Sequence, residues 1–505
     1  MNADAGQVQN DDPSEHVRWQ NLHPHNWRNP QPIGRYNLVV IGGGTAGLVT
    51  SAAGGLLGAR VALVEAHLLG GDCTNYGCVP SKALLACARQ AEAVRTSAEY
   101  GMQAQEPQID FSAVMARMRR LRAQISANDS AARFSDFGAD VYFGRASFQG
   151  RHQLRVGDTV LEFKKAVIAT GARAAVPEIS GLKEAGFQTN ETVFSLDRLP
   201  QHLIVLGGGP IGCELSQAFR RLGSRVTLVT TGKRLLPKDD PEAGSLLFEQ
   251  FQREAIDVIL SATVLSVETK GDTRRVLVRT SERSQILEGD QLLVAAGRQA
   301  NVDSLALQAA GVQFDRHGVV VNDHLRTSNP NIFAAGDVCS AYQFTHAAEA
   351  MARLVVQNAL FFGRKRISRL LIPWCTYTDP EVAHVGISAE EAARLPQEIN
   401  VYSKHLADVD RAILDGTPEG YARVYVKRRG GRIVGATYVA PRAGESIAEI
   451  VLAMQHGLRI GDLSGVIHPY PTVAESFKRA ADQHFQGQLK PWMRPWLRRY
   501  FRGRR

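Results

Sequence analysis

Two glycine-rich segments constrain the fold of this chain more than any other feature of its sequence. Each one follows an apolar run and precedes a helical stretch and a second apolar run, over residues 37–65 and 203–229. The glycines recur with GxGxxG spacing at Gly42, Gly44 and Gly47, and again at Gly207, Gly209 and Gly212. Glycine at these positions allows a tight turn, a close approach of a pyrophosphate, and a helix N-terminus aimed at the phosphates. The repeat therefore predicts two βαβ dinucleotide-binding sites.

A closely spaced pair of cysteines follows the first glycine-rich segment. Cys73 and Cys78 enclose four residues, so that one helical turn would bring the sulfurs together as a strained, reducible disulfide. Gly77 and Pro80 favour a specific turn rather than a smooth helix. The remaining cysteines are scattered, and we interpret them as buried small apolar residues: Cys87, Cys213, Cys339 and Cys375. The sequence has no CxxC zinc pair, so it predicts no metal site.

With the Gly-Cys-Val-Pro-Ser-Lys run at residues 77–82, the sequence resembles the pyridine-nucleotide disulfide oxidoreductase family from Tyr36 to Phe485. Dihydrolipoamide dehydrogenase, glutathione reductase and mercuric reductase belong to that family. The resemblance implies an α/β fold with two Rossmann-type domains, for FAD and NAD(P), and a C-terminal α+β dimerisation domain, hence a homodimer. The expected divisions are an N-terminal extension (1–35), the FAD-binding domain (36–185 and a return segment, 311–370), the NAD(P)-binding domain (186–310), the dimerisation domain (371–485) and a basic aromatic tail (486–505).

The resemblance also implies roles for individual residues. Cys78 would exchange electrons with the flavin, and Cys73 would attack the acceptor. Lys82 would lie beside the flavin, paired with Glu214. Further residues would bind the cofactors: Glu65 at the adenosine ribose, Asp337 at the ribityl chain, and Gly71, Thr170, Gly171, Gly297, Arg298 and Gly336 around them. An ordinary surface role for the charged residues stays open at this point.

The sequence after the second glycine-rich segment bears on the choice of nicotinamide. A carboxylate after Val229 would bind a ribose 2′-hydroxyl and repel a 2′-phosphate, but no acid stands there. Lys233 and Arg234 follow instead. The pattern favours NADPH, with NADH as the open alternative, and a basic turn without selectivity would look the same.

The acceptor depends on the segment that contains Tyr470 and Glu475. Disulfide-reducing members of the family carry a histidine five residues before the glutamate, where this chain has Tyr470. A phenol of pKa ~10 is a poor proton shuttle beside an imidazole of pKa ~6.5. Mercuric reductase shares the tyrosine, although its C-terminal cysteine pair and N-terminal CxxC domain have no counterpart here. We therefore expect reduction of a metal ion or another small acceptor.

Two other functions stay open. His468 would stand in as the acid of a dihydrolipoamide- or glutathione-type disulfide reductase, because residues two apart in an extended segment share a face. A thiol redox sensor or electron-transfer module at a membrane surface would instead show flavin and a titratable disulfide without appreciable turnover.

The distribution of charge along the chain bears on where the protein is located and on which macromolecules it binds. The net charge of +9 resides mainly in residues 486–505, which hold seven Lys/Arg and no acid. The nearly neutral remainder argues against a nucleic-acid groove, and residues 1–20 lack the apolar core of a secretory signal, so we expect a cytoplasmic protein. Trp492, Trp496 and Tyr500 recur every fourth residue among the basic residues, a pattern that suits an anchor on the inner face of an anionic membrane. Pro491 and Pro495 weaken a helix there, so an unstructured basic tail is the alternative.

Overall fold

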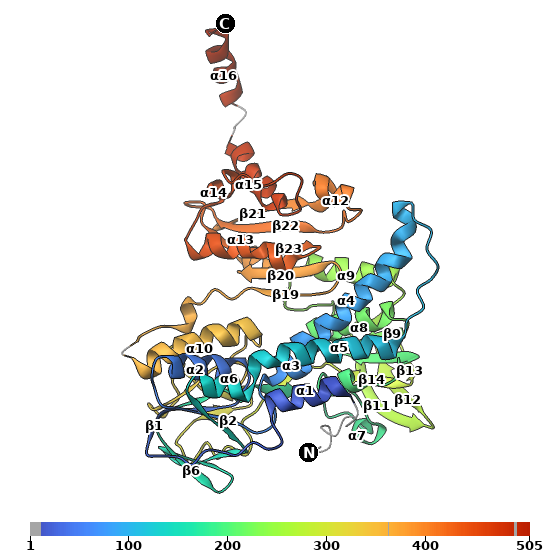
Figure 1. Ribbon diagram of the computed structural model, residues 1–505. Coiled ribbons are helices and arrows are strands. Elements are labelled where there is room, and N and C mark those ends of the chain that lie inside the picture. The colour runs from blue at the N-terminus through green and yellow to red at the C-terminus, as the bar shows by residue number, and fades with distance from the viewer. Residues whose placement is uncertain (1–11, 362, 489–491, 505) are drawn as a thin grey trace. The chain divides into compact units, whose positions relative to one another are not determined.

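The computed structural model describes residues 12–361, 363–488 and 492–504 (Figure 1). The chain divides into two compact units. The first comprises Met1–Thr231 and Ser261–Leu370, and the second comprises Gly232–Leu260 and Leu371–Arg505. The segment Gly232–Leu260 thus belongs with the C-terminal part of the chain, although it follows the second glycine-rich segment in sequence.

The first unit contains the predicted first dinucleotide fold. Parallel strands β1 (Tyr36–Ile41), β2 (Val61–Glu65), β3 (Ala139–Phe143), β6 (Thr159–Ile168) and β18 (Ile332–Ala334) form its sheet. Strands β4 (Ala146–Gly150) and β5 (Gln153–Val156) extend it antiparallel beyond β6. Helix α2 (Thr45–Leu56) connects β1 to β2 and packs beside α10 (Thr345–Leu360), as Figure 1 shows. Because β18 returns to the sheet next to β6, residues near 336 meet the first glycine-rich loop.

Helices around the cysteines form a second layer of this unit. The short helix α3 (Gly71–Tyr76) runs into α4 (Cys78–Arg95) after a break at Gly77. Helix α5 (Phe111–Ser126) packs on both, and α1 (Pro13–Leu22) packs on α5. The N-terminal extension therefore contains a helix within the fold of the first unit.

The second glycine-rich segment builds a smaller parallel sheet. Strands β8 (His202–Leu206), β9 (Arg225–Val229) and β14 (Gln291–Val294) are ordered β9-β8-β14, and α8 (Pro210–Arg221) joins β8 to β9. An antiparallel sheet of β11 (Thr263–Lys270), β12 (Thr273–Arg279) and β13 (Ser284–Gly289) precedes β14 in the chain. The short strands β7 (Ala172–Ala174) and β15 (Arg298–Ala300) pair with each other.

The second unit is built on an antiparallel sheet in the order β19-β20-β23-β22-β21. Its strands are β19 (Trp374–Thr376), β20 (Glu381–Gly386), β21 (Ile399–His405), β22 (Tyr421–Lys427) and β23 (Ile433–Ala440). Helix α13 (Ala443–Gln455) packs on β20 and β23, and α15 (Glu475–Gln488) packs on β21 and β22. Three further helices of this unit are used below: α9 (Pro241–Arg253), α12 (Asp410–Leu414) and α14 (Ile460–Ser464).

The basic tail contains helix α16 (Met493–Arg502). Pro495 does not prevent it, because this proline lies in the first helical turn, where backbone N–H groups have no partner within the helix. Within the described ranges, no helix has both the length and the apolar character needed to cross a membrane.

Candidate active site

The cysteine pair lies at the junction of two helices in the first unit. Cys73 belongs to α3, and Cys78 is the first residue of α4. Gly77 between them has φ −125° and ψ −110°, which ends the first helix and redirects the chain. Both cysteines are free thiols in this structure and are hydrogen-bonded to each other. The predicted specific turn is therefore present, with the pair in its dithiol form.

The two thiols differ in acidity. The hydrogen bond from Cys73 lowers the pKa of Cys78, and the hydroxyl of Thr345 and the charge of Lys82 lower it further. The Cys78 sulfur lies 3.4 Å from Oγ1 of Thr345. The same hydrogen bond, together with burial, raises the pKa of Cys73. A dithiol with this asymmetry carries its first negative charge on Cys78.

Lys82 and Glu214 form the ion pair that the sequence predicted. Nζ of Lys82, on α4, donates to Oε2 of Glu214, on α8, at 2.7 Å. The glutamate is buried and the lysine is partly exposed. The pair thus lies between the cysteine helix and the helix of the second glycine-rich segment, four residues beyond Cys78.

Arg298 connects the cysteine helix to the return segment of the first sheet. It pairs with Asp72 at 3.1 Å and with Asp337 at 3.5 Å, and it donates to the carbonyl of Ala172. Burial raises the pKa of Asp337 to about 6, although Arg298 opposes the shift. Asp337 is therefore a half-buried carboxyl group that pairs with Arg298, and it has capacity to accept a ligand hydroxyl.

The glycine-rich loops fit two dinucleotides. A Cβ on Gly47 would lie 1.7 Å from the carbonyl oxygen of Gly42, and one on Gly212 would lie 1.9 Å from that of Gly207, so each helix starts in direct contact with its loop. Helices α2 and α8 begin after Gly44 and Gly209 without a side-chain cap. Their first N–H groups are therefore available to a pyrophosphate. A Cβ on Gly209 would meet nothing within 4 Å, which leaves room for a phosphate to approach.

The other residues predicted to hold the first dinucleotide surround the same loop. The carboxylate of Glu65, at the end of β2, accepts from the N–H groups of Gly43 and His67 at 2.6 and 2.7 Å, and burial raises its pKa. Gly71 approaches Gly44 closely, because a Cβ on it would lie 2.5 Å from the Gly44 Cα. Thr170 and Gly171 follow β6, where the Thr170 hydroxyl donates to the carbonyl of Asn301. Gly297 precedes β15, and Gly336 follows β18 with Ala46 of α2 as its neighbour.

Lys233 and Arg234 lie in the second unit, on the wall of a hollow of about 330 Å³. Phe248 and Glu249 of α9 line the same hollow. Arg234 donates to the carboxylate of Glu390 at 2.6 Å and to the carbonyl of Pro237 at 3.1 Å. The guanidinium is thus partly engaged by a carboxylate of its own unit.

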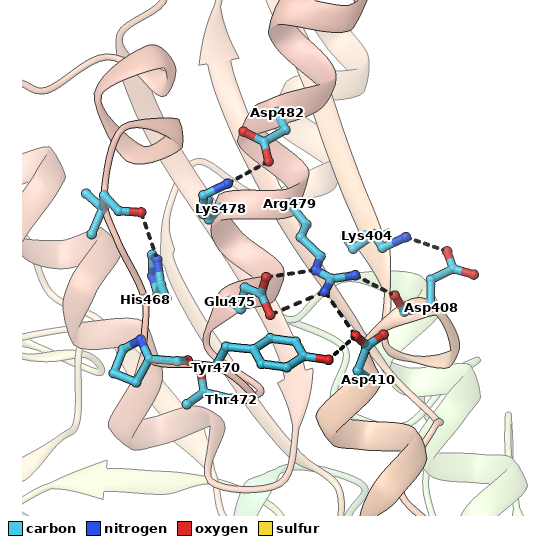
Figure 2. A network of polar contacts seen from close by, with 12 residues as sticks. Lys404, Asp408, Asp410, His468, Tyr470, Thr472, Glu475, Lys478, Arg479 and Asp482 are labelled. Carbon is cyan, nitrogen blue, oxygen red and sulfur yellow. Dashed lines mark hydrogen bonds and ion pairs between the residues drawn. The ribbon is translucent and has the colours of Figure 1, made fainter.

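Tyr470 and Glu475 belong to one polar network of the second unit, shown in Figure 2. The Tyr470 hydroxyl donates to Oδ2 of Asp410 at 2.8 Å, which raises the pKa of the phenol. Arg479 pairs with Glu475 at 3.1 Å and with Asp410 at 3.5 Å. Arg479 therefore occupies the carboxylate that would orient an imidazole at position 470.

His468 takes part in different contacts. Its Nε2 lies 3.1 Å from both carboxylate oxygens of Glu449, on α13, and its Nδ1 lies 3.3 Å from the carbonyl of Val466. His468 and Tyr470 thus bind carboxylates of different helices, Glu449 of α13 and Asp410 of α12, and the shared face expected for them stays a prediction. The expectation that the four other cysteines are buried holds fully only for Cys213, since Cys87, Cys339 and Cys375 are partly exposed.

Sequence reasoning missed several residues near the site. Thr345 is 267 positions away from Cys78 and belongs to no motif. Asp410 and Arg479 are single charged residues on α12 and α15, and no local pattern marks them. Of the residues that were missed, only Asn75 could have been recognised from the sequence, because it lies between the two cysteines. Among the described residues, no group of three or more His, Cys, Asp or Glu side chains is arranged to hold a metal ion.

Comparisons with known proteins agree with this arrangement. Residues 36–352 match the family model described as pyridine nucleotide-disulphide oxidoreductase, and residues 372–481 match its dimerisation domain. The chain is 33% identical to a mercuric reductase of Staphylococcus aureus over 449 residues, which are 89% of this chain and 82% of that protein. It is 32% identical to a dihydrolipoyl dehydrogenase of Thermus scotoductus, over 88% of this chain and 97% of that one.

A similar structure is the Cu(II) complex of the HOCl-induced flavoprotein disulfide reductase RclA from Escherichia coli. It has a TM-score of 0.79 and 29% identity, and covers 88% of this chain and 98% of the other. The match to the dimerisation domain supports a homodimer. The chain therefore belongs to the pyridine nucleotide-disulphide oxidoreductase family and is a flavoprotein that uses FAD and NAD(P)H to act on a sulfur group or a metal ion.

Proposed function

We propose that this enzyme uses NADPH to reduce a metal ion or another small acceptor through Cys73 and Cys78. The observation that carries the proposal is the network around Tyr470. Its hydroxyl is bound to Asp410 and has a raised pKa, and Glu475 is bound to Arg479. A phenol in this setting is a weak proton donor to a leaving thiolate, whereas reduction of a metal ion has no leaving thiolate.

Cys73, Cys78 and Lys82 have different roles in the proposed reaction. FAD, when bound at the Gly42–Gly47 loop, would supply the two-electron carrier between the nicotinamide and the cysteine pair. Cys78, with its lowered pKa, holds the thiolate, and Lys82 favours the thiolate by its positive charge, although the carboxylate of Glu214 partly offsets this effect. Cys73, with its raised pKa, keeps its proton until an acceptor displaces it.

The electron count fits a metal ion. One dithiol gives two electrons when its disulfide forms, and it releases two protons. These electrons reduce one mercuric ion to the element or two cupric ions to cuprous ions. The relative from Staphylococcus aureus is named a mercuric reductase, and RclA was solved as a Cu(II) complex. Both names support a thiol-binding metal ion as the acceptor class here.

A preference for NADPH is part of the proposal. No acid follows β9 to repel a 2′-phosphate, and Lys233 lines the hollow beside α9. Because Arg234 is engaged by Glu390, we assign the larger share of the selectivity to Lys233.

His468 favours a second function, the reduction of a small disulfide. Its ring faces the carboxylate of Glu449, which is the pairing that would orient an imidazole as a general acid. The dihydrolipoyl dehydrogenase relative supports this alternative.

We also propose that the protein is cytoplasmic and binds the inner face of the membrane through α16. Met493, Trp496, Leu497, Tyr500 and Phe501 recur at helical spacing along one side, and α16 has no buried residue. The arginines of the helix lie at 494, 498, 499 and 502, on the other side. A short helix with one apolar and one basic face suits an interface with anionic lipid.

The acceptor is tested by steady-state oxidation of NADPH and NADH by the purified yellow protein. The acceptors compared are mercuric ion with excess thiol, cupric ion, lipoamide, oxidised glutathione and quinones. We expect turnover with a metal ion to exceed turnover with either disulfide, and a lower KM for NADPH than for NADH. Rapid disulfide turnover that His468→Ala abolishes would instead establish the second function. Negligible turnover with every acceptor would indicate a redox sensor.

A further inference from the structure

The N-terminal extension places buried charges against the turn that carries the cysteines. Glu15 and Arg18 of α1 are 2% and 5% exposed, and Arg122 of α5 is 4% exposed. The two arginines both bind Asn75, which is 1% exposed and lies between Cys73 and Cys78 in sequence, and Glu15 binds both arginines. The family model matches the chain only from residue 36, so α1 is an addition to the part that the model describes.

Asn75 is the centre of these contacts. Arg18 Nη1 donates to its side-chain oxygen at 2.7 Å, and Arg122 Nη1 donates to its main-chain oxygen at 2.8 Å. Its side-chain N–H₂ group donates to the carbonyls of Leu69 and Gly71 at 3.0 and 2.9 Å. The side-chain amide of Asn75 thus uses both of its donors and its acceptor to fix the start of α3.

Glu15 holds the two arginines in place. One of its carboxylate oxygens accepts from Nε and Nη2 of Arg18 at 3.0 and 2.6 Å, and the other accepts from Nη2 of Arg122 at 2.6 Å. Buried charges are retained only where they are paired and hydrogen-bonded, and this group is both. Charge-assisted hydrogen bonds are also the stronger and more directional ones. Helix α1 therefore binds α3 through the guanidinium of Arg18, α5 binds it through that of Arg122, and Glu15 of α1 fixes both groups.

We propose that α1 positions the turn of residues 73–78, called the redox turn below, and that Arg18 and Asn75 are positioning residues for Cys73. Because α3 carries Cys73 and α4 carries Cys78, the orientation of α3 sets how readily one sulfur reaches the other. Loosening α3 lowers the effective concentration of one thiol at the other and shifts the equilibrium from disulfide toward dithiol. The proposal rests on the redox role proposed above for the cysteine pair.

The test is the thiol–disulfide equilibrium of the holoenzyme in glutathione redox buffers, read by alkylation and mass spectrometry of Cys73 and Cys78. Arg18→Leu removes the contact with Asn75. Arg119→Leu is the matched control, since Arg119 pairs with Asp12 at the start of α1 at 2.5 Å and does not bind the redox turn in the described structure. We expect at least about a tenfold shift toward the dithiol in Arg18→Leu, equivalent to about 30 mV for a two-electron couple. Arg119→Leu should stay near the wild type.

Asn75→Ala tests the same contact from the other side and serves if Arg18→Leu does not fold. It should shift the equilibrium in the same direction. The double variant should shift it by less than the sum of the two single changes, because both remove one interaction. Equal shifts in Arg18→Leu and Arg119→Leu, or no shift in Arg18→Leu and Asn75→Ala, would refute the positioning role of α1. Neither result would affect the redox role of the cysteine pair. If the wild-type cysteines form no reversible disulfide, both the redox role of the pair and the positioning role of α1 are refuted.

Discussion

At the scale of single residues, Thr345 is the least expected part of the site. Its hydroxyl is a hydrogen-bond partner of the Cys78 sulfur and contributes to the lowered pKa of that thiol. Thr345→Val should therefore raise the pKa of Cys78, by up to about one unit, or ~1.4 kcal/mol of differential stabilisation of the thiolate. The thiolate is populated above this pKa and is lost as the pH falls through it, so the variant should lose its thiolate at a higher pH.

The measurement is a pH titration of the long-wavelength absorbance that a thiolate next to oxidised flavin produces in the two-electron-reduced enzyme. Thr74→Val is a matched control, because the Thr74 hydroxyl donates to Asp129 rather than to a cysteine. Cys78→Ser should abolish the absorbance. Its survival in that variant would show that the two sulfurs have the opposite roles.

A second prediction concerns Tyr470 and its network. Tyr470→His should raise turnover with lipoamide or oxidised glutathione, because general acid catalysis contributes ~10²- to 10⁴-fold. Since Arg479 binds Glu475, the gain should be larger in the double variant with Arg479→Leu, which frees the carboxylate for the imidazole. The rate of flavin reduction by NADPH, measured by stopped flow, should not change. If the wild type already reduces disulfides quickly, and neither change raises that rate, Tyr470 does not limit the reduction of disulfides.

The residues that the sequence predicted correctly share one property, a fixed position in a local motif. The pairing of Lys82 with Glu214 was implied by the resemblance to the family, which rests on the motifs that contain these two residues. Thr345 and Arg479 act across the fold from helices without a motif, so only the three-dimensional arrangement reveals them. The contact of His468 with Glu449 was unpredictable for the same reason, because Glu449 belongs to no motif.

At the scale of elements, the two βαβ repeats were predictable because a side chain has no room at Gly42 and Gly47, or at Gly207 and Gly212. Helix α1 was not predicted, since its stability depends on buried pairs with residues 75 and 122 rather than on an apolar stripe. Helix α16 was left open because Pro491 and Pro495 weaken a helix in general, and of these two only Pro495 lies within the described residues. The position of Pro495 in the first turn is what makes the helix compatible with it.

Helix α16 gives a prediction of its own. The full chain should float with vesicles that contain phosphatidylglycerol and remain in the pellet with pure phosphatidylcholine, because each basic residue near an anionic surface contributes ~1 kcal/mol. A chain that ends at Gln488 should float with neither. A variant with Trp496→Asp and Phe501→Asp keeps every arginine and should lose most of the binding, whereas Ile467→Asp, at an exposed position outside the helix, should keep it. Equal flotation of the full and shortened chains would exclude a role for the helix.

At the scale of the whole molecule, the match to the dimerisation domain leads to a prediction about two subunits. By resemblance to the family, the segment with Tyr470 and Glu475 would complete the site of the other subunit. A Cys78→Ser subunit mixed with a Tyr470→Ala, Glu475→Leu subunit should then regain activity, since each mixed dimer has one site without a substitution. The measurement is metal-ion-dependent NADPH oxidation after co-expression with two purification tags. No recovery in the mixed dimers would place both parts of a site in one chain.

The division of the chain into two compact units could not be predicted in full from the family resemblance. The sequence predicted the α/β class and the dimerisation domain from motifs that match the family. It did not reveal that Gly232–Leu260 packs with the C-terminal residues, because this depends on contacts of α9 far along the chain. Asp240 of this segment is 3% exposed and pairs with Arg423 at 2.7 Å, and Trp374 donates to Asp239 at 2.7 Å.

These contacts of α9 limit how the protein recombines with its relatives. A chimera that exchanges only residues 371–505 would separate Arg423 from Asp240 and leave a buried carboxylate without its cation. An exchange that also carries residues 232–260 would keep the pair together. Exchange of the second unit between such enzymes should therefore succeed when residues 232–260 are exchanged together with residues 371–505, so the exchangeable module is discontinuous in the sequence.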